Sequence, residues 1–467
     1  MSSKQKEDEA KKDPREAVNL SCRGPVLFLA FSAIAWLLVY SLFTMLAGVK
    51  VHASGMMADS AWMSYGRIVP AADLALQFGF LVQLGLGVSA WVLSHRGKTV
   101  LVDGGYLYIG GIVWNIGVTL GFVGILSGHA SGLDGLAMPG HVLPILFTGF
   151  VLIGVSLVQT NNRRTDMEMS PVQWFIFAST LWLPWVLGAG YLLIHFFDAK
   201  GVMANIIDWW FIHNFSKIYL TFVALGVVGH FSMALTGREV IGRGYAVFAF
   251  WVMLLFGSIG GISPGAPVPA WLPALSTVTA MFYFVGAVAI WHVLRHTQKE
   301  ATLLDEDDSG SFTLMRLALI LFATIVLVDV FFAFPGPGRS AEFTTFVSGF
   351  DKLYQLGFVG LALLGALYHI FPRLAGVNFC PRLCKLQTLA YLLGALGATL
   401  PSALGGLMSG DAVLGSGFYF ASVGDLLLLL ASFILFVNFL VATVMAMKSC
   451  ECLARLLGRG EEKEARA

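Results

Sequence analysis

The residues best suited to redox chemistry in this chain are its ten histidines, because imidazole is a common ligand of heme iron and copper. His213 follows two tryptophans and precedes Asn214 where an apolar run begins. Lys217 comes one helical turn later, so the two side chains are expected to share a helix face. A lone imidazole binds copper weakly, and a neighbouring ammonium group repels the copper ion. We therefore interpret His213 as a polar core residue rather than as a strong metal ligand.

The elements that position these residues are predicted to be membrane spans. Apolar residues make up 57% of the chain and charged residues 12%, against about 25% charged in a typical soluble domain. Runs of 18 or more apolar residues recur along the sequence, and such runs predict transmembrane helices. We predict an all-α membrane protein with spans at 25–48, 72–94, 104–126, 141–160, 171–196, 207–235, 244–262, 272–294, 312–335, 350–371, 387–408 and 416–447.

This division assigns residues 25–447 to one twelve-helix domain between two polar cytoplasmic tails, 1–24 and 448–467. The segments between the spans are short, and some contain Pro and Gly. Pro264 to Pro269 and the PGPG sequence at Pro335 to Gly338 are examples, which predict turns.

The distribution of Lys and Arg gives the predicted orientation. With the N-terminus inside, the inside segments hold 22 Lys and Arg residues and the outside loops hold four. This asymmetry follows the positive-inside rule, so both termini are expected on the cytoplasmic side. The formal net charge of +1 gives no reason to expect binding to nucleic acid.

The five cysteines all fall on the predicted cytoplasmic side, where disulfides are rare, so we expect free thiols. The alternative is a four-thiolate metal site made by Cys380, Cys384, Cys450 and Cys452, but these spacings are atypical. On the opposite side His129 and His141 flank a glycine-rich segment. They could bind a metal or the heme of a partner, although we do not expect this.

The segment from Asp208, DWWFIHNFSKIYL, resembles the sixth helix of the catalytic subunit of heme-copper oxidases, especially the cbb3-type cytochrome c oxidases. In that family a similar WWxxHN segment supplies one copper ligand. The segments Tyr65 to Phe80 and Leu364 to Leu374 resemble the entry of the second helix and the end of the tenth. The resemblance covers roughly residues 25 to 445. It implies a subunit I-like bundle of twelve helices in the bacterial inner membrane, working in respiratory electron transport.

The resemblance also implies six histidines, two for a low-spin heme, one for a high-spin heme and three for copper. Of these only His213 is present, as the single surviving copper-ligand position. The heme-ligand positions fall on Ala72, Phe350 and Lys352, and the adjacent pair of copper ligands falls near Ser263 to Pro264. We therefore expect no heme or copper bound in the family manner and no catalytic residues.

Removing a heme from a bundle leaves a cavity that other side chains must fill. The aromatic residues expected at the right depth are Phe78, Phe80, Phe350, Tyr354 and Phe358.

Ionisable residues also stand at the vacated positions. Asp73 is next to Ala72 at a depth similar to that of Lys352, and Lys217 is a further replacement. Because charges inside a membrane are costly and usually pair, we predict that Asp73 and Lys352 form an ion pair. The alternatives are that each reaches the outer surface separately, or that Asp351 is the partner of a lysine. For Asp329 and Asp425 we expect structural hydrogen bonds.

The leading functional hypothesis is a cofactor-free scaffold subunit of a respiratory complex. It would bind other membrane subunits and membrane-anchored or periplasmic cytochrome c proteins, which would carry the heme. One alternative is an active terminal oxidase or nitric oxide reductase with displaced ligands. Another is a twelve-helix transporter, for which the sequence offers no internal repeat.

Overall fold

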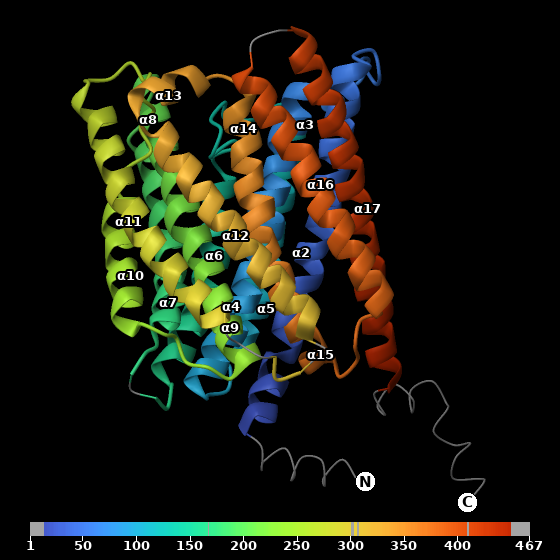
Figure 1. The fold of residues 1–467 in the computed structure, drawn as a ribbon. Coiled ribbons are helices and arrows are strands. Elements are labelled where there is room, and N and C mark those ends of the chain that lie inside the picture. Colours follow the sequence, from blue (N-terminus) through green and yellow to red (C-terminus); the bar gives the residue numbers. More distant parts are fainter. Residues whose placement is uncertain (1–13, 167, 300–302, 306–307, 409–410, 450–467) are drawn as a thin grey trace, which may run out of the picture.

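The computed structural model describes residues 14–166, 168–299, 303–305, 308–408 and 411–449. The predicted terminal tails fall largely outside the described residues, as do Cys450 and Cys452. Within the described part of the chain every regular element is a helix, and the long helices run side by side in one elongated bundle (Figure 1). Cys22, Cys380 and Cys384 are free thiols there, as predicted.

The helices in chain order are α2 (Pro14–His52), α3 (Tyr65–Leu74), α4 (Val82–Gly97), α5 (Gly104–Leu126), α6 (Val142–Asn162), α7 (Pro171–Tyr191), α8 (Val202–Asn214), α9 (Thr221–Thr236), α10 (Arg243–Gly257), α11 (Trp271–Lys299), α12 (Ser309–Phe332), α13 (Pro335–Ala341), α14 (Thr345–Lys352), α15 (Leu361–Ala375), α16 (Pro381–Leu407) and α17 (Asp411–Ser449). Short π-helical segments are η2 (Ala75–Leu81), η3 (Leu192–Phe196), η4 (Phe215–Leu220) and η6 (Leu353–Gly360), and η1 (Ala61–Met63) is a 3₁₀ turn.

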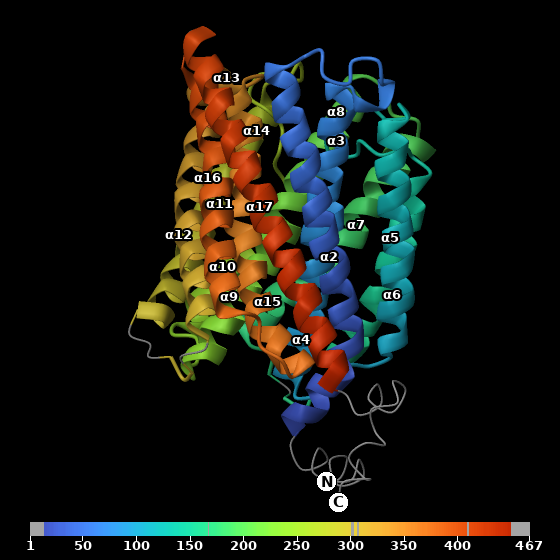
Figure 2. The same cartoon turned by 90° about the vertical axis from the view of Figure 1, so that its right-hand side faces the viewer.

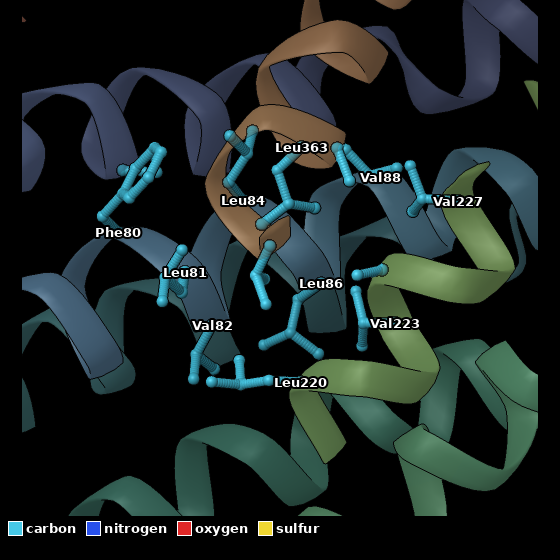
Figure 3. Packing of buried hydrophobic residues seen from close by; sticks show 14 of the residues in the cluster. Phe80, Leu81, Val82, Leu84, Leu86, Val88, Leu220, Val223, Val227 and Leu363 are labelled. Atoms are coloured by element: carbon cyan, nitrogen blue, oxygen red, sulfur yellow. The ribbon is translucent and has the colours of Figure 1, made fainter. Parts of the chain in front are cut away.

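Three spans form the interior of the bundle. They are 65–97, 202–236 and 345–375, and the most apolar part of each is 94% buried, whereas that of the other long spans is 33–44% buried. The inner three are therefore almost enclosed by protein, and the others have one face free for lipid. Figure 3 shows how aliphatic side chains such as Leu86, Val223 and Leu363 from the three inner spans pack together.

Each inner span is interrupted by a π-helical segment. The π turns begin at Ala75, Phe215 and Leu353, within three residues of Ala72, His213 and Lys352 respectively. A π turn adds a residue to the helical turn and is frequent at functional sites. The backbone thus departs from regular α-helix next to each of these predicted ligand positions.

Eleven helices of the described chain are long and apolar enough to cross a membrane. The shorter α10 has 15 residues, about 22 Å of helix against a hydrocarbon core of about 30 Å. Because α2 begins and α17 ends at the same end of the bundle (Figures 1 and 2), the number of crossings is even. The predicted total of twelve is reached when α10 and the loop after it make one crossing.

Two predicted boundaries were wrong for a local reason. The expected span 244–262 ends as a helix at Gly257, because the following glycines and prolines do not continue it. The expected turn at Pro335 to Gly338 instead begins α13, in which Pro335 occupies the first helical position.

We call the end of the bundle where α2 begins the inner end, and the opposite end the outer end.

Close contact between α16 and α17 depends on small residues. A Cβ atom at Gly424 would lie 2.0 Å from the backbone nitrogen of Ala398, and one at Gly394 would lie 2.7 Å from that of Leu428. Small residues let transmembrane helices approach until their backbones touch, and this contact replaces the hydrophobic driving force that is absent in lipid.

Gly424→Ala is therefore expected to lower the stability of the bundle by about 1–3 kcal/mol, because the added methyl group forces the two helices apart. The measurement is thermal unfolding in detergent. Gly105→Ala in α5 is the matched control, since a Cβ there meets nothing within 4 Å. Equal melting temperatures for the two variants would contradict the packing argument.

Candidate functional site

The predicted site residues gather in the outer half of the bundle, around the three inner spans. His213 lies in the last turn of α8, directly before η4. Its ring faces the loop after α10, where a Cβ at Gly260 would lie 2.7 Å from Nε2. A Cβ at Gly261 would lie 2.5 Å from the Cβ of His213, and Gly261 has a φ of +99°. Two glycines therefore let the loop close against the imidazole.

This loop occupies the place where the resemblance puts the adjacent copper ligands, and it is held from three sides. The backbone N–H of Ile262 donates to Ser276 Oγ at 3.1 Å, and Ser263 donates to Glu342. Arg339 Nε donates to the carbonyl of Pro264 at 3.3 Å. Irregular backbone at membrane depth persists only where protein satisfies its polar groups, and here side chains of α11, of α13 and of the residue after α13 form hydrogen bonds with the loop.

Lys217 forms an ion pair that the sequence analysis did not identify. Its Nζ lies 2.8 Å from Asp329 Oδ1 of α12, and 5.6 Å from the ring centre of Tyr354. Both charged side chains are mostly buried. The two residues are far apart in the sequence, so the only available signal was that each is an intramembrane charge in need of a partner.

Asp73 and Lys352 are in the predicted contact. Lys352 Nζ of α14 lies 3.8 Å from Asp73 Oδ1 of α3, next to the buried Ala72. The side chains keep 28% and 35% of their surface accessible, so the protein buries the pair only in part. Asp351 and Asp425 lie within electrostatic range of the two lysines, Asp351 of Lys217 and Asp425 of Lys352. Carboxylates and amines thus form a connected polar region across the vacated positions.

Most of the predicted aromatic residues are in the core. Phe78, Phe80, Tyr354 and Phe358 are at most 5% exposed, whereas Phe350 is only partly buried. Phe78 stacks on Phe215 with ring centres 5.4 Å apart. The hydroxyl of Tyr354 donates to the Ser216 carbonyl at 2.5 Å, which ties η6 to η4. Large rings therefore fill much of the space between the inner spans.

Phe350 lies instead in a small second cluster. It stacks on Phe346 at 5.6 Å, and Phe346 in turn contacts Phe332 of α12. It belongs to α14, the short helix with which this span begins at the outer end of the bundle. Phe350 therefore packs at the edge of the bundle rather than between the inner spans.

A histidine cluster at the inner end was not predicted. His95, His230 and His369 come from the inner ends of the three inner spans and surround the Trp91 indole, with ring centres 3.9, 5.6 and 5.9 Å from it. Nothing in the spacing of these histidines along the sequence indicated that they meet.

Each of these imidazoles already has a partner. His95 Nε2 donates to Asn19 Oδ1 at 2.8 Å, and Arg96 Nε donates to His230 Nδ1 at 3.1 Å. His369 Nδ1 donates to Asp308 Oδ1 at 3.0 Å. Since the indole of Trp91 occupies the space between the rings, this cluster does not fit a heme or a copper ion.

Asp308 anchors this cluster at the start of α12. Its carboxylate accepts hydrogen bonds from His369 and from both terminal nitrogens of Arg373. Burial raises the pKa of Asp308, but the hydrogen bonds and charges of His369 and Arg373 outweigh burial and hold that pKa below its usual value.

The residues present do not fit the cofactors that the resemblance implies. Among the described residues no three His, Cys, Asp or Glu side chains come close enough to hold a metal ion. His213 faces glycine backbone, and its Nε2 has no hydrogen-bond partner in the described chain. At the predicted tenth-helix heme-ligand position Lys352 pairs with Asp73, the residue next to the predicted second-helix ligand position Ala72. The arrangement can hold charge and bind helices together, but it offers no ligand set for iron or copper.

Comparison with known proteins identifies relatives of this chain. The sequence model of the family described as cytochrome C and quinol oxidase polypeptide I matches residues 24–414. The bacteroid "cytochrome c oxidase subunit 1 homolog" of Bradyrhizobium diazoefficiens is 20% identical over 370 residues, which are 75% of this chain and 65% of that protein. The "Cbb3-type cytochrome c oxidase subunit CcoN1" of Stutzerimonas stutzeri is 21% identical over 68% of this chain and 69% of that one.

The fold has a similar counterpart among solved structures. A cryo-EM structure of a heme-copper terminal oxidase dimer matches with a TM-score of 0.70 and 13% identity, and covers 90% of this chain and 84% of that one. The alignments with the Bradyrhizobium and Agrobacterium tumefaciens relatives include about 65% and 62% of those proteins' lengths.

Lys217→Met is expected to destabilise the bundle by up to about 3 kcal/mol, because it leaves the Asp329 carboxylate unpaired at membrane depth. The double variant Lys217→Met with Asp329→Leu should recover most of this loss. Thermal unfolding of the single and double variants in detergent measures the effect. Lys98→Met, which breaks the exposed pair with Asp166, is the control and should cost less than about 1 kcal/mol. A double variant no more stable than the single one would contradict an energetic coupling.

Asp308→Asn is expected to lower stability at neutral pH by roughly 1–3 kcal/mol through loss of the charged hydrogen bonds. Because the folded-state pKa of Asp308 is depressed, its contribution is present above the unfolded-state pKa of about 3.9 and is lost as the pH falls through the folded-state pKa. The stability difference from the parent protein should therefore shrink below about pH 4. A difference that is constant from pH 7 to the acid limit would refute this assignment.

Proposed function

Because the chain belongs to the cytochrome C and quinol oxidase polypeptide I family, the catalytic-subunit family of heme-copper oxidases, we propose that it acts as a cofactor-free membrane scaffold within a respiratory complex. It keeps the subunit I fold and anchors redox partners, and it does not itself reduce oxygen. Fold alone does not determine this, since one fold supports several functions. The proposal rests on the side chains at the positions where the family binds its cofactors.

The observation that carries the proposal is the ion pair of Asp73 and Lys352 next to Ala72. By the resemblance, Ala72 and Lys352 occupy positions that hold heme ligands in the second and tenth helices of the family, and Asp73 is the residue next to Ala72. A carboxylate and an amine stabilise one another there, and neither residue supplies the imidazole that ligates heme iron. The packing of Phe78 and Tyr354 between the same spans supports the same conclusion.

The copper position gives independent support. His213 retains the family residue type, but Gly260 and Gly261 occupy the space in front of its ring. Lys217 and Asp329 place a second ion pair one turn further into the membrane. With one imidazole, two glycines and a neighbouring ammonium group, this position lacks the three nitrogen ligands of the family's copper.

The proposed partners follow from the family. The curated relatives are bacterial oxidase subunits, which supports a place in the cytoplasmic membrane among other subunits. We propose that membrane-anchored or periplasmic cytochrome c proteins bind this chain and carry the heme. The orientation proposed from the Lys and Arg distribution, with both termini in the cytoplasm, puts the vacated sites in the outer half of the membrane.

The test is to purify the full chain free of its partners and to measure heme by its reduced-minus-oxidised spectrum and copper by elemental analysis. Both are expected far below one per chain, and His213→Ala should change neither quantity. A bona fide cbb3-type subunit prepared in parallel is the positive control. Stoichiometric heme or copper in the purified chain would overturn the proposal and favour an active oxidase with displaced ligands, and loss of that copper in His213→Ala would identify His213 as its ligand.

A further inference from the structure

A cavity of about 670 Å³ lies at the outer end of the bundle, away from the vacated cofactor positions. It is open to the surface and is bordered by the loop between α5 and α6, the π-helical end of α7, and the start of α8. Three imidazoles and one amine line it, from His129, His141, His195 and Lys200. Its lining contains no Asp or Glu. The cavity therefore offers hydrogen-bond donors and one ammonium group, and the carboxylate that pairs with this group, Asp198, lies outside the lining.

The loop that forms one wall is rigidly held. The buried carboxylate of Asp208 accepts hydrogen bonds from the backbone N–H groups of Asp134, Gly135 and Leu136, at 3.0, 3.2 and 3.0 Å. On the other side His195 packs against Gly140, where a Cβ would lie 2.5 Å from the ring. The wall is thus fixed in advance, and a ligand entering the cavity need not order it.

Two helices begin at the cavity. The residue before α6 is His141 and the residue before α8 is Gly201, which has a φ of +59°, and both line the cavity. The first N–H groups of a helix have no partner within it, and the helix dipole makes this end positive. Both helix starts add to the effect of the imidazoles and the amine, so the expected ligand is an anion.

Lys200 is available to such a ligand. Its present partner is Asp198, at 2.6 Å, and both side chains are more than two-thirds exposed. Ion pairs between exposed residues contribute little free energy, so the amine can exchange one carboxylate for another anion at small cost.

An exposed apolar surface adjoins the cavity. Phe196 and Phe197 at the end of η3 are 73% and 68% exposed, and Val202 and Met203 at the start of α8 are also exposed. Leu192, one turn before Phe196, is exposed on the lipid-facing side of the same segment. A polar, donor-rich cavity beside apolar side chains at the end of a transmembrane helix matches an amphiphile with an anionic head.

From this geometry we propose that the cavity binds the phosphate-bearing headgroup of an anionic phospholipid from the leaflet at the outer end. Its volume exceeds that of a free phosphate several times and leaves room for the glycerol part of a headgroup. The apolar surface at Phe196, Phe197 and Met203 would contact the acyl chains. This binding does not depend on whether the protein carries a cofactor.

The experiment uses the full chain in detergent and measures binding of short-chain phosphatidylglycerol by calorimetry. The double variant His141→Asn with Lys200→Gln is compared with the parent protein. Binding should weaken roughly tenfold or more, because two charge-assisted donors are lost. Phosphatidylcholine with the same acyl chains should bind much more weakly than phosphatidylglycerol to the parent protein. Lys98→Gln, in an exposed ion pair at the inner end, is the matched control and should bind as the parent does.

Three outcomes would overturn the proposal. They are equal binding of phosphatidylglycerol by the parent and the double variant, equal binding of the two lipids by the parent, and inorganic phosphate binding as tightly as the lipid. If the anionic lipid fails to bind while an acidic cytochrome domain binds at His141 and Lys200, the site is a protein-docking site instead. Should the double variant not fold, Lys200→Gln alone provides the comparison, since this exposed side chain has no structural role beyond its pair with Asp198.

Discussion

The cost of placing charge inside a membrane is the constraint on which the interior of this protein depends. Lys217 and Lys352 both lie within transmembrane spans, and each has a carboxylate partner on another helix, Asp329 of α12 and Asp73 of α3. An unpaired charge at this depth would cost several kcal/mol, which is comparable with the whole stability of many proteins. Each pair therefore neutralises two charges and also fixes the relative depth of two helices. In related subunits that positioning is expected of the cofactor, which joins the same helices through its ligands.

The π turns and the unwound loop lie next to the same residues. Each inner span changes from α- to π-helix within three residues of Ala72, His213 or Lys352. After α10 the segment from Ser258 to Pro264 is not helical, and it contacts His213 directly through Gly260 and Gly261. Ser276 and Arg339 form hydrogen bonds with the backbone of this segment, so its polar groups are partly satisfied by side chains of neighbouring helices.

The sequence predicted those features that depend on local pattern. Hydrophobic runs and the Lys and Arg distribution gave twelve spans, and the shared depth of Asp73 and Lys352 gave their contact. It did not predict the pairing of Lys217 with Asp329, because the two spans meet only in the folded bundle. The cluster around Trp91 at the inner end was not predicted for the same reason, since His95, His230 and His369 come from three separate helices. The early end of α10 was missed because an apolar run continues past Gly257, while the glycines within it end the helix.

Helix α8 positions two separate segments at the outer end of the bundle. Asp208 lies in the same helix as His213, and its carboxylate holds the loop that forms one wall of the outer cavity. In the same helix, Asn214 donates to the carbonyl of Ser258 and so holds the start of the loop that faces His213. One helix therefore positions both the loop that borders the outer cavity and the segment that faces His213. A change in α8 would move the two together, so the outer surface and the surroundings of His213 depend on the same helix.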